Sequence, residues 1–261
     1  MPESPPEVSS KQPPVRVAQG GWGVAVGMAA MYMLGMAVVW QFAHTSYSQA
    51  AVLMHDVWWA MVILATLAVV VARLTGLRIQ RSNRITGFAF VAIVPVVLAV
   101  MGSIGAISVS RVNHWNLIGI VVLGTLFVGI GEETTYRGVV LNALADRLSV
   151  PWMVIISSVF FGLLHTVNLL LQSAQATAVQ VVITTCIGLL FGWTYVSTGG
   201  NLWLVIVLHW LYDASLISSL ATSHGTNLMG AVPSLLLAVG GIGATVVFGR
   251  RYRGQRWNDI A

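Results

Sequence analysis

Eight long apolar runs dominate the sequence and limit what this chain can fold into. Each is close to the roughly 20 residues that an α-helix needs to cross the hydrocarbon core of a bilayer. Only 8% of the residues are charged, whereas soluble domains usually have roughly 25%. The sequence therefore predicts an all-α fold, a polytopic membrane bundle of about eight transmembrane helices. The expected helices are 21–43, 51–72, 85–109, 116–145, 151–171, 175–197, 202–221 and 229–249.

The two ends of the chain differ from this apolar body. Residues 1–18 are rich in proline, serine and charge and have little apolar surface to bury, so we expect a disordered tail. The first apolar run is longer than the ~7–15-residue core of a signal peptide, and we expect it to remain as an anchor. A single transmembrane domain is expected over 19–249, followed by a basic tail over 250–261.

The positive charges predict how the bundle sits in the membrane. If the N-terminus is cytoplasmic, 12 of the 13 basic residues fall in cytoplasmic segments and Arg111 alone lies outside. Because cytoplasmic loops carry the excess of Lys and Arg, we expect both tails to be cytoplasmic. The net charge of +5 then reflects membrane topology, so we expect contact with the lipid bilayer and no nucleic-acid partner. Arginine outnumbers lysine twelve to one, a hint of a GC-rich bacterial genome, so a bacterial plasma membrane is the expected location.

Two adjacent glutamates, Glu132 and Glu133, stand inside the fourth run. A charged side chain at the bilayer centre costs roughly 2.5–3.5 kcal/mol on insertion scales, so such residues are usually paired or functional. Glu133 and Arg137 are one helical turn apart in the favourable order for an ion pair, which could also be purely structural. Glu132 faces about 100° away and has no such partner. We therefore predict that the chemistry lies at Glu132.

Histidines inside the runs supply the remaining candidates. His165 lies in the fifth run, and His209 and Asp213 lie one turn apart on one face of the seventh. Glu132 and His165 are almost equally far from Ser149, 17 and 16 residues, and should therefore lie at nearly the same height.

The expected height of His209 along its helix does not match the height shared by Glu132 and His165. It lies only 8 residues after Asn201, at the end of the turn 197–201. The mismatch disappears if this turn is drawn into the protein, or if the fourth helix ends early and leaves the membrane before Arg147. Both alternatives stay open at this point.

Three short motifs thus stand in order on three apolar runs. They are Glu132-Glu133-x-x-x-Arg137, Phe161-x-x-x-His165 and His209-x-x-x-Asp213. Together they resemble the signature of the CAAX-protease and bacteriocin-processing (CPBP/Abi) family of intramembrane endopeptidases. The resemblance implies a protease-like bundle of about eight helices, with a water-filled cavity open toward the cytoplasm. It also implies that Glu132 and His165 activate a water, while the third motif stabilises the oxyanion.

The expected activity is hydrolysis of a peptide bond in a membrane-associated protein or peptide. Such hydrolysis needs a base for the water and a donor or cation for the developing oxyanion. Many members of the family carry Asn where this chain has Asp213, and an ionised Asp cannot donate a hydrogen bond. Asp213 is therefore protonated, or orients His209, or belongs to a metal site.

A zinc site is the alternative to a metal-free enzyme. Glu132, His165, His209 and Asp213 are all side chains that bind zinc. The usual zincin signature, however, places two histidines one turn apart on a single helix, with the glutamate base between them. Here the histidines lie on separate helices, so we favour a site without metal or other cofactor.

Two other classes of function remain open. Intramembrane acids and histidines also mark proton-coupled transporters, although this chain lacks the repeated halves typical of them. A non-catalytic membrane scaffold or bacteriocin-immunity factor could keep the same fold. Gly23-x-x-x-Gly27 and Gly188-x-x-x-Gly192 are predicted to be close helix-packing contacts and not chemistry.

Overall fold

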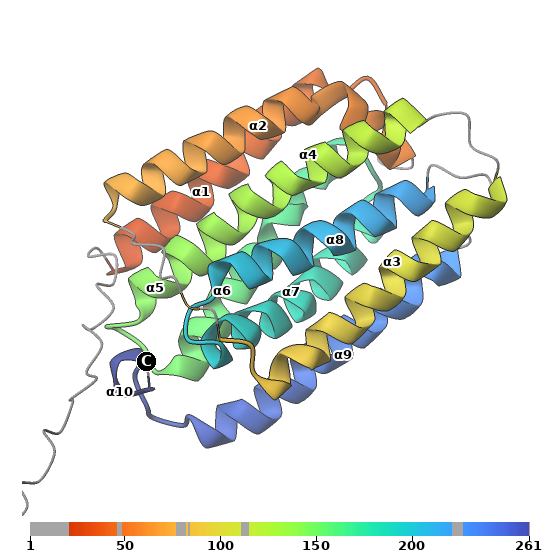
Figure 1. Cartoon of the computed structure of the whole chain (residues 1–261). Helices are drawn as coiled ribbons and strands as arrows, with labels where there is room; N and C mark the ends of the chain where they lie inside the picture. The colour runs from red at the N-terminus through yellow and green to blue at the C-terminus, as the bar shows by residue number, and fades with distance from the viewer. Residues whose placement is uncertain are drawn as a thin grey trace, which may run out of the picture.

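The computed structural model describes residues 21–45, 49–76, 82, 84–110, 115–220 and 227–260. Within these residues every regular element is helical, and the predicted all-α class is confirmed (Figure 1). The predicted tail 1–18 lies outside the described residues. The α-helices are α1 (Gly21–Val39), α2 (Ala50–Leu74), α3 (Phe90–Ser110), α4 (Trp115–Glu133), α5 (Leu141–Leu144), α6 (Val150–Leu164), α7 (Ala174–Ser197), α8 (Leu202–Leu220), α9 (Asn227–Arg251) and α10 (Trp257–Ile260).

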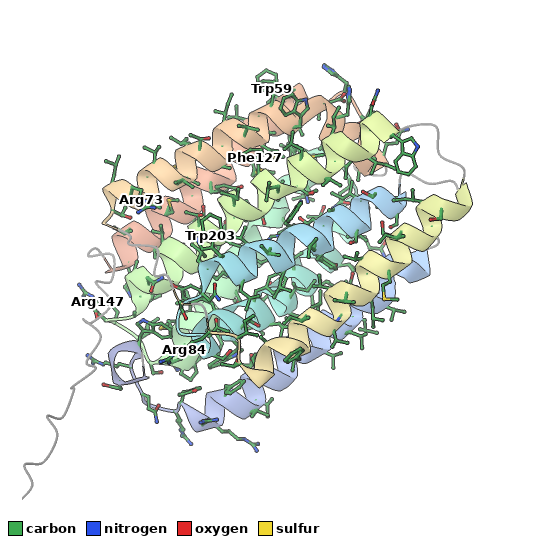
Figure 2. All side chains as sticks on the ribbon, viewed as in Figure 1. Trp59, Arg73, Arg84, Phe127, Arg147 and Trp203 are labelled. Atoms are coloured by element: carbon green, nitrogen blue, oxygen red, sulfur yellow. The ribbon has the colours of Figure 1, made fainter. Side chains whose placement is uncertain are left out.

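Eight helical spans in the described chain are long and apolar enough to cross a membrane, as the sequence predicts. Side chains that point away from the bundle along these spans are largely apolar, for example Leu34 and Ile63 (Figure 2). Such a surface is stable in lipid and unstable in water. The chain is therefore an integral membrane protein.

Most of the arginines gather at one end of the bundle. Arg73, Arg84 and Arg147 lie there, while Trp59 lies toward the other end (Figure 2). Helix α9 also finishes in two arginines at this end, which we call the arginine-rich end. Arg137 is an exception to the charge pattern, because its side chain is fully buried within the bundle.

Helix α4 runs through the middle of the bundle, packed between α2 and α8 (Figure 1). Helix α8 in turn packs on α3, and α7 packs on α6 and α9. The α4–α8 approach depends on Gly129, where a Cβ would lie 3.3 Å from the carbonyl oxygen of Ile206. The two helices that carry the first and third motifs are therefore in direct contact.

One of the two predicted glycine contacts exists. A Cβ at Gly192 would lie 2.9 Å from Val154 Cγ1, and one at Gly188 would lie 3.1 Å from Phe161, so α7 packs closely on α6. The prediction for Gly23 and Gly27 is wrong. Both are exposed, and no heavy atom of another described element lies within 4 Å of a Cβ placed at either.

The fourth predicted helix changes its winding at the first motif. Helix α4 ends at Glu133, and a π-helical segment, Thr134–Val140, follows before α5. The wider winding leaves backbone carbonyls in need of donors, and two side chains provide them. Ser157 Oγ donates to Tyr136 O at 2.7 Å, and Asn142 Nδ2 donates to Arg137 O at 2.8 Å. Such π-helical turns are often found at functional sites.

The segment predicted as a basic tail, 250–261, is in part folded onto the bundle. The Trp257 side chain is only 1% exposed, and its ring stacks on Tyr195 with ring centroids 6.1 Å apart. Val150 N donates to Gln255 O at 2.9 Å. This C-terminal segment therefore caps the arginine-rich end and packs against α6 and α7.

Replacing Trp257 with alanine is expected to destabilise the protein, because removing a buried aromatic side chain typically costs about 3–5 kcal/mol. Trp203→Ala is the matched control, since the Trp203 side chain is 55% exposed. Thermal unfolding in detergent should show a clearly lower Tm for Trp257→Ala than for Trp203→Ala. Equal Tm values would mean that the C-terminal segment does not dock as described.

Candidate active site

Glu133 and Arg137 form a buried ion pair at the start of the π-helical segment. Arg137 Nη1 donates to Glu133 Oε1 at 2.9 Å. Arg137 Nη2 donates to the carbonyl oxygen of Gly188 at 3.0 Å, and the guanidinium lies 4.3 Å from the centre of the Phe161 ring. One cation therefore connects α4, α6 and α7 in the middle of the bundle.

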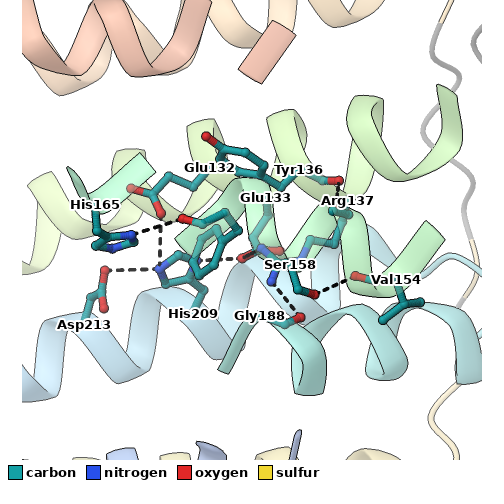
Figure 3. A network of polar contacts seen from close by, with 12 residues as sticks. Glu132, Glu133, Tyr136, Arg137, Val154, Ser158, His165, Gly188, His209 and Asp213 are labelled. Atoms are coloured by element: carbon teal, nitrogen blue, oxygen red, sulfur yellow. Dashed lines mark hydrogen bonds and ion pairs between the residues drawn. The ribbon is translucent and has the colours of Figure 1, made fainter. Parts of the chain in front are cut away.

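Glu133 also contacts the third motif, which the sequence reasoning missed. The same Oε1 atom lies 2.7 Å from Nδ1 of His209 on α8 (Figure 3). The i, i+4 rule finds the Arg137 partner within one helix but says nothing about neighbouring helices. The sequence feature that could have indicated this contact is Gly129, which permits the close approach of α4 and α8.

Carboxylates face both ring nitrogens of His209. Besides Glu133 at Nδ1, Asp213 Oδ2 lies 3.3 Å from Nε2, and Glu132 Oε2 lies 3.9 Å from the same atom (Figure 3). Both nitrogens are therefore placed to donate hydrogen bonds, as in an imidazolium. The contact to Glu133 is short, whereas those to Asp213 and Glu132 are longer than a usual N–H···O bond.

The Glu132 carboxylate is buried but more weakly paired than that of Glu133, because its contact with His209 Nε2 is 3.9 Å long. Its Oε2 atom accepts no hydrogen bond from any residue of the described chain. Glu132 also lines a cavity of about 640 Å³, within the range of roughly 300–1,000 Å³ that is usual for ligand pockets. This carboxylate is therefore available to a water or a substrate in that cavity.

His165 lies where α6 ends and a 3₁₀ segment, His165–Leu170, begins. Its Nδ1 is 3.1 Å from the carbonyl oxygen of Phe161, and since a carbonyl only accepts, Nδ1 carries the proton. In a neutral ring, Nε2 is then the acceptor. His165 lines the same cavity as Glu132, although no direct contact joins the two side chains among the described residues.

The height of His209 is explained by the turn before α8. Thr198 and Asn201 of this turn are buried. Ser82 Oγ donates to Thr198 O at 2.6 Å, and Asn201 Nδ2 donates to Arg84 O at 3.3 Å, so Ser82 and Arg84 contact the turn. The turn is thus drawn into the protein, the first of the two alternatives left open by the sequence.

The four candidate residues line one cavity. Within the described chain, no three His, Cys, Asp or Glu side chains are grouped as metal ligands. Nδ1 of His209 contacts Glu133, so Nε2, which faces Asp213 and Glu132, is the nitrogen that could bind an ion. The walls around the four residues are mostly apolar, with Phe161 and Phe191 packed against the His209 ring.

Two comparisons with known proteins agree with the resemblance seen in the motifs. Residues 114–215 match the family model described as type II CAAX prenyl endopeptidase Rce1-like. A stretch of 99 residues is 35% identical to CAAX prenyl protease 2 of Saccharomyces cerevisiae. That stretch is 32% of this chain and 31% of the yeast protein, so the chain spans about a third of the length of this curated relative. The predicted resemblance is confirmed over a segment that contains all three motifs.

Replacing Glu133 with glutamine is expected to destabilise the protein strongly. Breaking a buried pair by removing one charge typically costs about 3–5 kcal/mol, because the other charge is left uncompensated. Glu132→Gln removes the same charge one residue earlier without stranding Arg137, and serves as the control. Thermal unfolding in detergent should give a markedly lower Tm for Glu133→Gln alone. If both variants unfold at the wild-type Tm, the pair does not stabilise the bundle.

Proposed function

We propose that this chain, which carries a type II CAAX prenyl endopeptidase-like segment over residues 114–215, is an intramembrane endopeptidase. It hydrolyses a peptide bond of a membrane-associated protein or peptide. The observation that carries this proposal is the buried, weakly paired carboxylate of Glu132, which shares one cavity with His165, His209 and Asp213. Peptide hydrolysis uses this combination of a base and nearby hydrogen-bond donors.

In the proposed reaction, Glu132 removes a proton from a water in the cavity. The Nε2 atom of His165 accepts a hydrogen bond from the same water and orients it toward the scissile carbonyl carbon. The oxygen of the water forms the new bond to carbon, and the amide nitrogen leaves with the proton that Glu132 returns. A positioned base of this kind typically contributes about 10²–10⁴-fold to the rate.

His209 is the proposed donor to the oxyanion. Its ring is held at Nδ1 by Glu133, so Nε2 is presented to the cavity. The 3.3 Å and 3.9 Å separations from Asp213 and Glu132 leave the Nε2 proton weakly engaged. The proton can therefore turn to a carbonyl oxygen as negative charge develops there. In this scheme Asp213 orients and charges His209, which accounts for an aspartate at this position.

Glu132→Gln is expected to lower cleavage by about 100-fold or more, because an amide cannot accept the proton of the water. Purified protein is incubated with a fluorogenic peptide on a lipid anchor, and initial rates are measured at matched, folded concentrations. Asp56→Asn, at the opposite end of the bundle from the arginines, is the control and should cleave like the wild type. Equal cleavage by Glu132→Gln and wild type would rule out this mechanism and favour a binding or transport function.

The absence of a metal requirement is a separate prediction. We expect elemental analysis of active protein to find less than stoichiometric zinc, and exhaustive chelation to leave cleavage unchanged. The reason is that the two histidines lie on separate helices, unlike the histidines of the zincin signature. Stoichiometric zinc whose removal abolishes activity and whose return restores it would contradict the scheme. Glu132, His165, His209 and Asp213 would then be reassigned as ligands.

A further inference from the structure

The cavity extends from the catalytic residues toward only one end of the bundle. Its walls beyond Glu132 come from the later residues of α1 and α8 and from the earlier residues of α2, α7 and α9. These are the helix ends away from the arginine-rich end (Figures 1 and 2). Residues that represent them are Met36, Ala50, Ala176, Leu220 and Ala231.

The space between the site and the arginine-rich end is filled. Tyr136, Arg137, Leu141 and Trp193 lie on that side of the catalytic residues, and all four are completely buried. Further out, Ser82 is hydrogen-bonded to the buried Thr198 of the turn before α8. A peptide approaching from the arginine-rich end would therefore meet packed side chains.

Part of the exposed cavity wall is formed by the first halves of α7 and α9. Val179 on α7 is 55% exposed and Leu235 on α9 is 64% exposed, and both line the cavity. The two helices are in tight contact farther along, where a Cβ at Gly241 would collide with the carbonyl oxygen of Cys186. Leu235 is six residues before this contact, about 9 Å along the helix axis. The opening thus begins close to the crossing and faces lipid.

The wall between this opening and the site is uncharged. Apart from Glu132, Asp213 and the two histidines, the described lining residues are apolar or neutral polar. Asn168 and Gln180 form an amide cluster there, in which Asn168 Nδ2 donates to Gln180 Oε1 at 3.0 Å. A neutral wall of this kind suits an apolar peptide, whereas a charged side chain would find no counter-charge on it.

The position of the cavity means that two predictions from the sequence cannot both be correct. The arginines predict a cytoplasmic arginine-rich end, whereas the resemblance implies a cavity open toward the cytoplasm. Since the cavity lies toward the opposite end, both cannot hold. Arginine and lysine bias is the physical determinant of orientation, and we therefore place the opening in the outer leaflet.

We propose that the substrate is an apolar transmembrane segment that reaches the site sideways, between α7 and α9, from the non-cytoplasmic leaflet. This inference rests on the proposed function and specifies its substrate class. The segment would unwind beside the Asn168–Gln180 cluster before its backbone reaches Glu132. Such a substrate differs from a soluble tail that approaches from the cytoplasm.

The entrance is tested with paired substitutions on the two helices. Val179→Trp narrows the opening, whereas Val182→Trp, at a 63% exposed residue that does not line the cavity, does not. Leu235→Trp and Leu236→Trp form the second pair. With a transmembrane peptide of about 20 Leu- and Val-rich residues, the entrance variants should lose about tenfold or more in kcat/KM. Equal losses within each pair would overturn the lateral route.

A binding readout separates this inference from the proposed function. A photo-crosslinker at position 179 or 182 is introduced into the Glu132→Gln variant, and crosslinking to the same peptide is measured. Crosslinking from 179 but not from 182 is expected. If the wild type cleaves the peptide but position 179 gives no more crosslinking than 182, the lateral route is wrong. If crosslinking is selective and the wild type cleaves nothing, the proteolytic function is wrong.

The leaflet is tested by labelling from each side of the membrane. Single cysteines at Gln175 and Arg253, both exposed and at opposite ends of the bundle, are placed in a Cys186→Ser background. A membrane-impermeant maleimide added to intact cells should label Gln175→Cys, and should label Arg253→Cys only after the cells are opened. The reverse pattern would place the opening on the cytoplasmic side and overturn the assignment of the leaflet.

Discussion

One oxygen atom, Oε1 of Glu133, accepts from both Arg137 and His209, and the rest of the catalytic region depends on it. Arg137 also binds the Gly188 carbonyl and packs on Phe161, so the same oxygen indirectly connects α4, α6, α7 and α8. Charges in a membrane interior are stable only when they are paired. Pairing therefore positions three motifs from distant parts of the sequence in one place.

This arrangement separates structural and reactive roles between adjacent glutamates. Glu133 Oε1 contacts Arg137 at 2.9 Å and His209 at 2.7 Å, whereas Glu132 lines the cavity and lies 3.9 Å from His209 Nε2. The π-helical segment that follows them is supported by Asn142 and Ser157, whose donors replace regular helical hydrogen bonds. Tyr195 in turn links Asn142 to the docked Trp257. The C-terminal segment thereby belongs to the support of the site.

The lateral opening follows from the same packing. Helices α7 and α9 touch closely at Gly241, and exposed residues in their first halves line the cavity, whereas the ion pair stays buried. A proposed substrate from the outer leaflet would encounter apolar walls first and carboxylates last. Desolvation of the peptide would then be complete before hydrolysis begins.

Hydropathy alone determined the all-α class and the number of spans, because the length of an apolar run is a local property that the bilayer thickness fixes. Helical periodicity likewise predicted the Glu133–Arg137 and His209–Asp213 neighbours. The contact between Glu133 and His209 and the side on which the cavity opens came only from tertiary structure. They depend on how closely separate helices approach, which local spacing does not encode. For the same reason Gly23 had the pattern of a packing residue although its face of α1 meets no other described helix.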